Sequence, residues 1–320
     1  MPSSVSLEKG TAPMYRLLFL ALARNQVFKK LFIAFPLTAR VLKYFVAGPT
    51  WEQTREVVAR LLDKGLKVSL EYLCEDGRAT EQLDNTVAAY TDLLEQIDQA
   101  GWAGDVEVSV KPAALGLLLH DGEELALANT AKIAAKATAI NTSIIMDMAG
   151  PATVSKTLRI VNTLREQYSV DCVVQANYKR TERDCHGLDG PGSRVRLCKG
   201  SFKAPAPAAY TDNHDIDLSY VRCLKTLMEG EGTPLVATHD PVMIEIAQEL
   251  AAHTNRGLKD FEFQMLYGIR TLEQERLIDL GHIVRVNVPF GENWYDYLVQ
   301  RLAERPGNLR LFLRALVGWR

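Results

Sequence analysis

Short runs of apolar and β-branched residues recur from residue 67 onward, and stretches with helical spacing separate them. Eight runs have this character: KVSLEYL (67–73), VEVSVKP (106–112), SIIMDM (143–148), CVVQAN (172–177), RVRLCKG (194–200), PLVATHD (234–240), FEFQML (261–266) and HIVRVNV (282–288). The intervening segments include helical patterns over 87–97, 154–164, 220–228 and 244–252. Strict alternation of strand and helix predicts a parallel sheet.

The number of units indicates how this sheet closes. Eight strand–helix units within about 250 residues predict an α/β fold of the TIM type, a (β/α)8 barrel, rather than a doubly wound sheet. No GxGxxG motif follows the first strand, which also counts against a dinucleotide-binding Rossmann domain. We expect an N-terminal helical segment over residues 1–65 and the barrel over residues 66–320.

Residues 13–48 alternate apolar clusters with lysines and arginines at helical spacing and predict two or three helices. Thr50 and Gln53 form a capping-box pattern before a further helix, which Gly65 ends. The apolar run MYRLLFLALA is shorter than the roughly 20 residues that span a bilayer, and it lacks a basic leader and a cleavage site. We expect a soluble helix, with peripheral membrane contact as the alternative.

Composition narrows the function classes. A net charge of -2 with 24% charged residues gives no basic excess, so a nucleic-acid partner is not expected. The five cysteines lack CxxC spacing, which argues against a disulfide framework and against a zinc site. We therefore expect no metal and a reducing, cytoplasmic location.

Polar residues gather where the predicted strands end, and barrels of this type carry their chemistry at the carboxyl ends of the strands. These residues are Lys111, Asp147, Gln175, Asn177, Arg196, Lys199, Thr238, His239, Asp240, Gln264 and Asn287. The clustering predicts an active site at that end of the barrel.

Lys111 has two functional interpretations, a carboxylate-binding cation or a Schiff-base lysine, and a third in which it merely extends to solvent. Asp147 follows an apolar strand and needs a cation such as Lys111 or Arg301, in a catalytic or a structural ion pair. Arg196, Lys199 and the adjacent glycine would suit a flat anionic cofactor, or form a satisfied basic cluster.

The last predicted helix carries Trp294, Tyr297 and Arg301 one turn apart, with Glu304 three residues after the arginine. One helix face thus presents an aromatic ring, a guanidinium and a carboxylate. A surface helix with an Arg–Glu pair has the same pattern.

Eight segments taken together carry a resemblance: VSVKPAALG, MDM, VVQAN, RLCKGSF, ATHD, FEFQMLYGIR, VPFG and YLVQRLAERPGN. In this order, from about Met14 to the C-terminus, they resemble the short monofunctional members of the proline dehydrogenase family. The resemblance implies a distorted (β/α)8 barrel that binds FAD noncovalently, with the last helix over the barrel mouth. It also implies hydride transfer from the ring carbon beside nitrogen to flavin N5, formation of an imine, and reoxidation by a quinone or another acceptor.

The same resemblance implies roles for individual residues. FAD contacts are expected from Gln175, Arg196, Lys199, Gly200, Thr238, His239, Gln264, Arg301 and Glu304. The substrate site is expected from Lys111, Asp147, Leu266, Asn287, Tyr297, Gln300 and Arg301.

Two departures from the family pattern concern the substrate. Gln300 stands where the family has the first of two adjacent arginines that clamp the substrate carboxylate, a loss of about 1.5–3 kcal/mol for such a ligand. Asn287 stands where the family usually has tyrosine, and it leaves room for a polar ring substituent. The flavin motifs are better preserved, which favours a changed substrate over lost function.

Three hypotheses remain. The first is an FAD-dependent dehydrogenase that oxidises L-proline. The second keeps this chemistry for hydroxyproline or a carboxyl-masked cyclic amine of a biosynthetic pathway. The third is a flavin-free Schiff-base lyase using Lys111, or a binding protein without turnover; trapping of a substrate on Lys111 by borohydride would identify the lyase.

Overall fold

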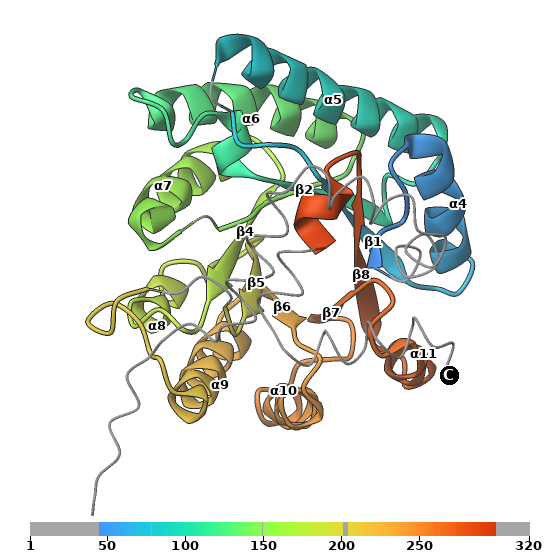
Figure 1. Cartoon of the computed structure of the whole chain (residues 1–320). Helices are drawn as coiled ribbons and strands as arrows, with labels where there is room; N and C mark the ends of the chain where they lie inside the picture. Colours follow the sequence, from blue (N-terminus) through green and yellow to red (C-terminus); the bar gives the residue numbers. More distant parts are fainter. Residues whose placement is uncertain (1–44, 78, 149, 201–203, 299–320) are drawn as a thin grey trace, which may run out of the picture.

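The chain closes into a barrel of eight parallel strands in sequence order, ringed by helices (Figure 1). The computed structural model describes residues 45–77, 79–148, 150–200 and 204–298. The strands are β1 (Lys67–Tyr72), β2 (Val106–Val110), β3 (Ile144–Met146), β4 (Val170–Gln175), β5 (Arg194–Cys198), β6 (Thr233–Ala237), β7 (Glu262–Leu266) and β8 (Ile283–Phe290). Each overlaps one of the eight predicted runs, so the (β/α)8 prediction is confirmed.

Helices follow the strands and form the outer layer (Figure 1). They are α4 (Trp51–Leu62), α5 (Thr80–Gln99), α6 (Gly122–Ala139), α7 (Val154–Arg165), α8 (Thr181–Cys185), α9 (Asn213–Glu229), α10 (Pro241–His253) and α11 (Thr271–Asp279). Short 3₁₀ helices, η1 (Pro112–Leu115) and η2 (Pro151–Thr153), follow β2 and β3.

Polar and apolar side chains alternate along the strands, and the two faces have different neighbours. On β2, Val106, Val108 and Val110 belong to the hydrophobic core, whereas Glu107 and Ser109 between them are buried polar residues. Successive strand side chains point to opposite faces of a sheet. The apolar face therefore meets the helices, and the polar face lines the inside of the barrel.

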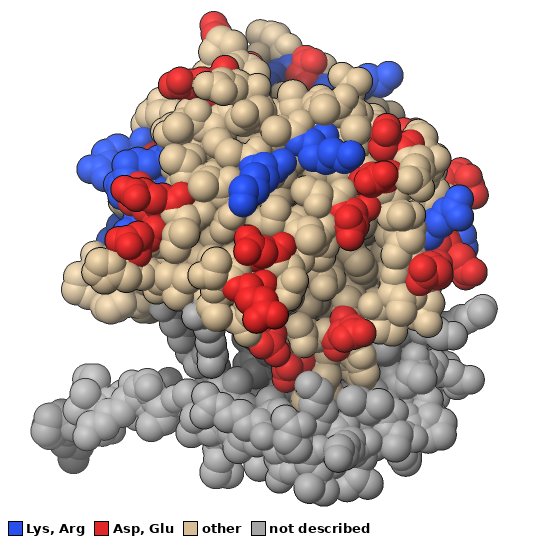
Figure 2. All heavy atoms as spheres, turned by 90° about the horizontal axis from the view of Figure 1, so that it is seen from above, with Lys and Arg blue, Asp and Glu red and all other residues tan. Residues whose placement is uncertain are grey.

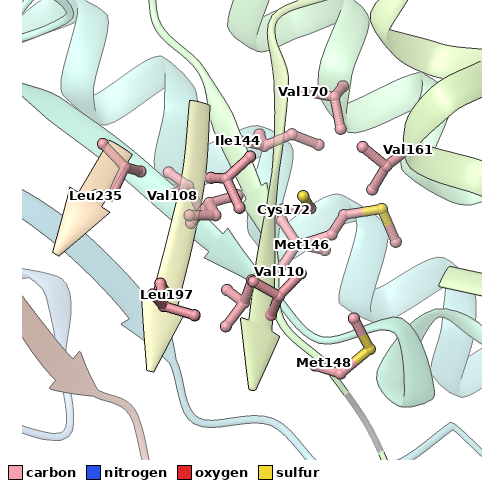
Figure 3. Packing of buried hydrophobic residues seen from close by; sticks show 14 of the residues in the cluster. Val108, Val110, Ile144, Met146, Met148, Val161, Val170, Cys172, Leu197 and Leu235 are labelled. Carbon is pink, nitrogen blue, oxygen red and sulfur yellow. The ribbon is translucent and has the colours of Figure 1, made fainter. Parts of the chain in front are cut away.

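The main hydrophobic core lies between the strands and the helix ring. Figure 3 shows apolar side chains of the strands gathered on this side, with Val161 of α7 beside Val170 of β4. Met146 of β3 and Cys172 of β4 belong to the same cluster and are fully buried. Complete burial of an aliphatic side chain contributes about 1.5–3 kcal/mol, so this layer holds each helix against its strand.

Helix α4 begins after Thr50, as predicted, but the capping box is wrong. The Thr50 side chain makes no capping hydrogen bond. A hydrogen bond from the Glu52 backbone N–H and one from the Thr50 hydroxyl lower the pKa of the Glu52 carboxyl, so this hydroxyl is engaged as a donor. Gly65 follows the helix with a φ of 78°, in the left-handed region that glycine tolerates.

The segment before α4 joins the barrel at the carboxyl end of β8. The backbone N–H of Ala47 donates to Pro289 O at 2.9 Å, and that of Gly291 donates to Gly48 O at 3.0 Å. The predicted helices of residues 13–48 lie outside the described residues, except for their last four positions. The domain boundary at residue 65 stays a prediction.

Charges of both signs are interspersed over the face shown in Figure 2. This distribution agrees with the small net charge of -2 and gives that face no extended basic patch. No helix in the described part of the chain is long and apolar enough to cross a membrane.

Candidate active site

The carboxyl ends of the strands bring the predicted polar residues to one mouth of the barrel. Lys111 follows β2 directly, and Asp147 follows β3. Gln175 ends β4, Gln264 lies in β7 and Asn287 lies in β8. Because all strands are parallel and closed in a ring, these ends share one face of the molecule.

Lys111 lies in a small polar cluster with Glu71 and Asn287. Its Nζ is 3.4 Å from Glu71 Oε1, and Asn287 Nδ2 donates to Glu71 Oε2 at 2.9 Å. Burial acts to lower the pKa of the Lys111 ammonium, but the carboxylates of Glu71 and Asp147 and the Cys74 thiol raise it overall. Lys111 therefore presents a stable positive charge.

Asp147 is held by residues other than those expected. Ser109 Oγ donates to its Oδ2 at 2.9 Å, and its Oδ1 is 3.6 Å from Arg196 Nη1. Burial raises the pKa of the Asp147 carboxyl, against the opposing effect of Arg196. The cation that pairs with Asp147 is thus Arg196, whereas Lys111 acts on it at longer range and pairs with Glu71; Arg301 lies outside the described residues.

Arg196 reaches into the barrel from β5 and is 7% exposed. Its Nε donates to Gln264 Oε1, and its Nη2 donates to Ser69 Oγ at 2.9 Å and to Glu107 Oε1 at 3.1 Å. These bonds use three of the five N–H donors of the guanidinium. Nη1 makes no hydrogen bond to a described residue and lies 3.6 Å from Asp147 Oδ1, with which it forms an ion pair.

Gln264 is fixed from two sides. Its Oε1 accepts from Arg196, and its Nε2 donates to Glu262 Oε1 at 2.6 Å. The hydrogen bonds to Arg196 and Glu262 thus fix the orientation of the Gln264 amide. Few of its hydrogen-bonding positions remain for contact with the edge of a heterocycle.

Lys199 lies between two carboxylates. Its Nζ is 2.5 Å from Asp217 Oδ1 of α9 and 2.7 Å from Asp240 Oδ2 at the start of α10. The hydrogen bond from Lys199 lowers the pKa of the Asp240 carboxyl. Asp240 Oδ1 also accepts from the backbone N–H of Val242 at 3.0 Å and caps α10.

Gly200 has a φ of 109°, and a Cβ there would lie 2.1 Å from Asn177 Oδ1. From the sequence, this glycine was expected beside a flat anionic cofactor or in a basic cluster. The neighbouring group in the structure is the Asn177 side chain, with Gln175 Oε1 next at 3.1 Å from the same point.

Thr238 and His239 shape the end of β6. Thr238 Oγ1 accepts from the backbone N–H of Asp240 at 3.1 Å. His239 Nε2 accepts from the backbone N–H of Leu266 at 2.8 Å, so the neutral ring carries its proton on Nδ1. Arg270 Nη1 donates to His239 O at 2.6 Å and fixes the backbone.

The last helix is described only at its start. Residues 294–298 are helical, and Tyr297 within them is half-buried. Gln300, Arg301 and Glu304 lie outside the described residues, so the prediction that this helix covers the mouth is untested.

The sequence reasoning missed four buried acidic residues of the barrel interior: Asp171, Glu262, Glu71 and Glu107. Alternation within KVSLEY and VEVSVK could have found the last two, because Glu71 and Ser69 share a strand face, as do Glu107, Ser109 and Lys111. An apolar-polar pattern normally places the polar face in solvent, and it gave no sign that this face turns inward.

The described residues offer no rival site of comparable chemistry. No group of three or more His, Cys, Asp or Glu side chains in this part of the chain could hold a metal ion. A hollow of about 450 Å³ lies beyond the C-termini of α9 and α10, away from the mouth. Its Arg256 donates to Met228 O at 2.7 Å and to Gly230 O at 2.5 Å, which is a structural helix cap.

Comparisons with known proteins agree with this arrangement. Residues 54–311 match the family model described as proline dehydrogenase. The chain is 31% identical over 305 residues to Proline dehydrogenase 1 of Bacillus subtilis subsp. natto, covering 95% of this chain and 99% of that protein. It is 32% identical over 280 residues to Proline dehydrogenase of Deinococcus radiodurans, covering 85% of this chain and 89% of that protein.

A solved structure has the same fold. The crystal structure of proline utilization A (PutA) from Bdellovibrio bacteriovorus inactivated by N-propargylglycine superposes with a TM-score of 0.77 at 18% identity. The match covers 96% of this chain and 40% of that longer chain. From the family model and the two relatives, the chain belongs to the proline dehydrogenase family of oxidoreductases.

Proposed function

We propose that the chain is an FAD-dependent proline dehydrogenase that oxidises the ring C–N bond of L-proline to an imine. The observation that carries this proposal is the pairing at the barrel mouth: Lys111 with Glu71, and Asp147 with Arg196, in a chain of this family. When bound, FAD supplies the acceptor for the hydride of the substrate.

Lys111 is the proposed partner of the substrate carboxylate. Its ammonium is held by Glu71 at 3.4 Å, and its raised pKa keeps the charge that a carboxylate needs. A Schiff-base lysine must instead be neutral to attack a carbonyl. The lyase hypothesis therefore finds no support in the environment of Lys111.

The residues present fit a flavin at the mouth. Arg196 offers Nη1 beside Asp147, and Gly200 keeps a side chain out of the crowded space near Asn177. We propose that these two positions, with Gln175, Thr238 and His239, hold FAD without a covalent bond.

Lys199 suggests which part of FAD it meets. Asp217 and Asp240 flank its ammonium, and a phosphate placed there would approach two carboxylates. Hydroxyl groups can donate to carboxylates and accept from an ammonium. Lys199 with its two carboxylates would therefore suit the hydroxyl groups of a bound FAD better than its phosphates.

A second substrate class is favoured by Asn287. Its Nδ2 is occupied by Glu71, whereas its buried Oδ1 has no hydrogen-bond partner among the described residues. A carbonyl oxygen in that state can accept from a hydroxyl on a substrate ring. Asn287 thus favours hydroxyproline as an alternative substrate, and Gln300, in place of an arginine, favours a cyclic amine whose carboxyl group is masked.

The remaining partner is an electron acceptor, for which we propose a quinone, with peripheral membrane contact as one way of reaching it. The five cysteines form no disulfide, in keeping with a reducing cytoplasm.

The proposal is tested by anaerobic absorbance spectroscopy of the purified protein. We expect a yellow protein whose flavin band is bleached by L-proline. The same titration is repeated with trans-4-hydroxy-L-proline and with L-prolinamide, which lacks the carboxylate charge.

Each outcome distinguishes the candidates. Bleaching by L-proline at the lowest concentration identifies a proline dehydrogenase and makes Gln300 a tolerated change. Bleaching by one of the modified amines alone identifies the second substrate class. A colourless protein that takes up no added FAD contradicts the flavin chemistry altogether.

A further inference from the structure

Glu107 is a buried carboxylate that the chemistry at the mouth does not use directly. It lies on β2 inside the barrel and is 1% exposed. Three arginines surround it: Arg194 Nη2 at 2.9 Å, Arg196 Nη2 at 3.1 Å and Arg285 Nε at 3.4 Å. Burial acts to raise the pKa of Glu107, but Arg285, Arg194 and Arg196 lower it to about 2, so the group is charged at neutral pH.

The other two arginines have further anionic partners. Arg194 also contacts Asp171 and Glu262, and Arg285 makes a two-point contact with Glu262 at 2.8 and 3.1 Å. Arg196 differs from them. Glu107 is the one carboxylate among the described residues that it hydrogen-bonds, since Asp147 is 3.6 Å away on the opposite side.

Glu107 supplies one of the negative charges that oppose the three arginines of the barrel interior. Arg194, Arg196 and Arg285 carry three positive charges, and Glu107, Asp171 and Glu262 oppose them. Arg196 is the arginine that faces the mouth, and loss of the Glu107 charge would leave it Asp147, at 3.6 Å, as its remaining carboxylate neighbour in the described part of the chain.

We propose that Glu107 is a positioning residue that holds the Arg196 guanidinium and sets the positive potential it presents to the flavin. The inference rests on the proposed function, in which FAD binds beside Arg196 Nη1. Glu107 thereby lowers the reduction potential of the flavin, because it offsets the charge that would stabilise the reduced form.

The direction of the effect follows from electrostatics. Accepting a hydride makes a flavin more negative, so a more positive site favours the reduced state. Charges act over longer distances inside a protein than in water, because the interior has a lower effective dielectric constant. Glu107 therefore influences the flavin through Arg196 without touching it.

The experiment compares the flavin midpoint potential of the wild-type holoenzyme with that of Glu107→Gln, by equilibration with a redox dye. Glutamine keeps the shape and an acceptor for Arg196 but removes the charge. We expect the ratio of reduced to oxidised flavin at a fixed potential to rise about tenfold, equivalent to about 30 mV for a two-electron couple. Glu249→Gln, on the exposed side of α10, is the matched control and should leave the ratio unchanged.

Glu107→Asp covers the case in which the glutamine variant does not fold. Aspartate keeps the negative charge, but its side chain is one methylene shorter, so the carboxylate lies farther from Arg196. We therefore expect a smaller rise, two- to threefold, in the ratio of reduced to oxidised flavin. A purely structural role would lower the melting temperature of both variants and leave the potential of the folded holoenzymes unchanged, which would overturn the inference.

The experiment also distinguishes a failure of the proposed function from a failure of the role proposed for Glu107. A wild-type protein that binds no FAD removes the basis of both proposals. A yellow wild type that L-proline reduces, with an unchanged potential in the folded Glu107 variants, rejects the role of Glu107 alone.

Discussion

At the scale of single residues, the site is built from side chains whose polar atoms are already engaged by the protein. Arg196 hydrogen-bonds Gln264 and Glu107, and Gln264 also hydrogen-bonds Glu262. Few of their N–H groups therefore remain for a ligand at the barrel mouth. Groups held in this way lose little further freedom when a ligand arrives, which is the physical basis of preorganisation.

Gly200 has a left-handed backbone conformation at the site, with a φ of 109°. Gly200→Ala should lower the free energy of unfolding by about 1–3 kcal/mol, because the left-handed φ disfavours a side chain. The Cβ would also displace Asn177, so we expect a lower content of bound FAD. Thermal unfolding and the flavin-to-protein absorbance ratio measure the two effects.

Gly190→Ala is the control for this substitution, because an added Cβ at Gly190 meets nothing within 4 Å. It should change neither stability nor flavin content appreciably. Equal behaviour of the two variants would contradict a special role for the Gly200 conformation.

At the scale of elements, stability and chemistry are separated between the two ends of the barrel. The strand ends at the mouth carry Lys111 and Asp147, whereas Arg256 at the other end secures α9. Its guanidinium donates to the backbone oxygens of Leu227, Met228 and Gly230, which are carbonyls left unpaired by the end of a helix.

Arg256→Met should therefore destabilise the fold without altering the site. The loss of charged hydrogen bonds to carbonyls predicts a decrease of about 1.5–3 kcal/mol in the free energy of unfolding. Arg276→Met, which breaks an exposed pair with Glu273, should cost less than about 1 kcal/mol. Urea denaturation tests this order, and an unchanged KM in both variants tests the separation of the two ends.

The hydrophobic pattern of the sequence predicted some of the helices and missed others. Helix α7 spans Val154–Arg165 and matches the predicted stretch 154–164, because its apolar residues recur at helical spacing. Helix α6 was not among the named stretches. It buries Ala126, Ala134 and Ala137, and alanine gives little contrast with polar neighbours in a sequence.

At the scale of the whole molecule, the barrel interior is a charged network enclosed by an apolar layer. Burial raises the pKa of the Asp171 carboxyl from 3.8 to about 6, against the effect of its partner Arg194. A raised carboxyl pKa means that the folded state binds this proton more tightly than the unfolded state does. The contribution of Asp171 to stability is therefore greatest below the unfolded pKa and is lost as the pH rises through about 6.

Asp171→Asn should remove this part of the pH dependence. Between about pH 4.5 and 7.5 we expect the wild-type free energy of unfolding to fall by an Asp171 contribution on the order of 1–3 kcal/mol, and the variant to lack this fall. Urea titrations at both pH values measure the difference. Asp98→Asn, on the exposed surface of α5, should keep the wild-type slope, and an identical slope in all three proteins would contradict the assignment.

The chain sequence by itself determined the class of the fold, the eight strands and the family. Strand periodicity, helix spacing and ordered motifs are local properties that can be read along the chain without knowing which elements meet. The sequence also placed Lys111 and Asp147 at strand ends, because that position depends only on where an apolar run stops.

The tertiary structure alone decided which groups meet. Asp147 pairs with Arg196 rather than Lys111, and Glu71 and Glu107 enter the site although neither residue was among the sequence candidates. Arg196 and Glu107 are 89 positions apart in the chain, and their contact exists only once β2 and β5 face each other across a closed barrel. Such contacts depend on barrel closure and on burial, which set the distances and the dielectric environment that no local pattern contains.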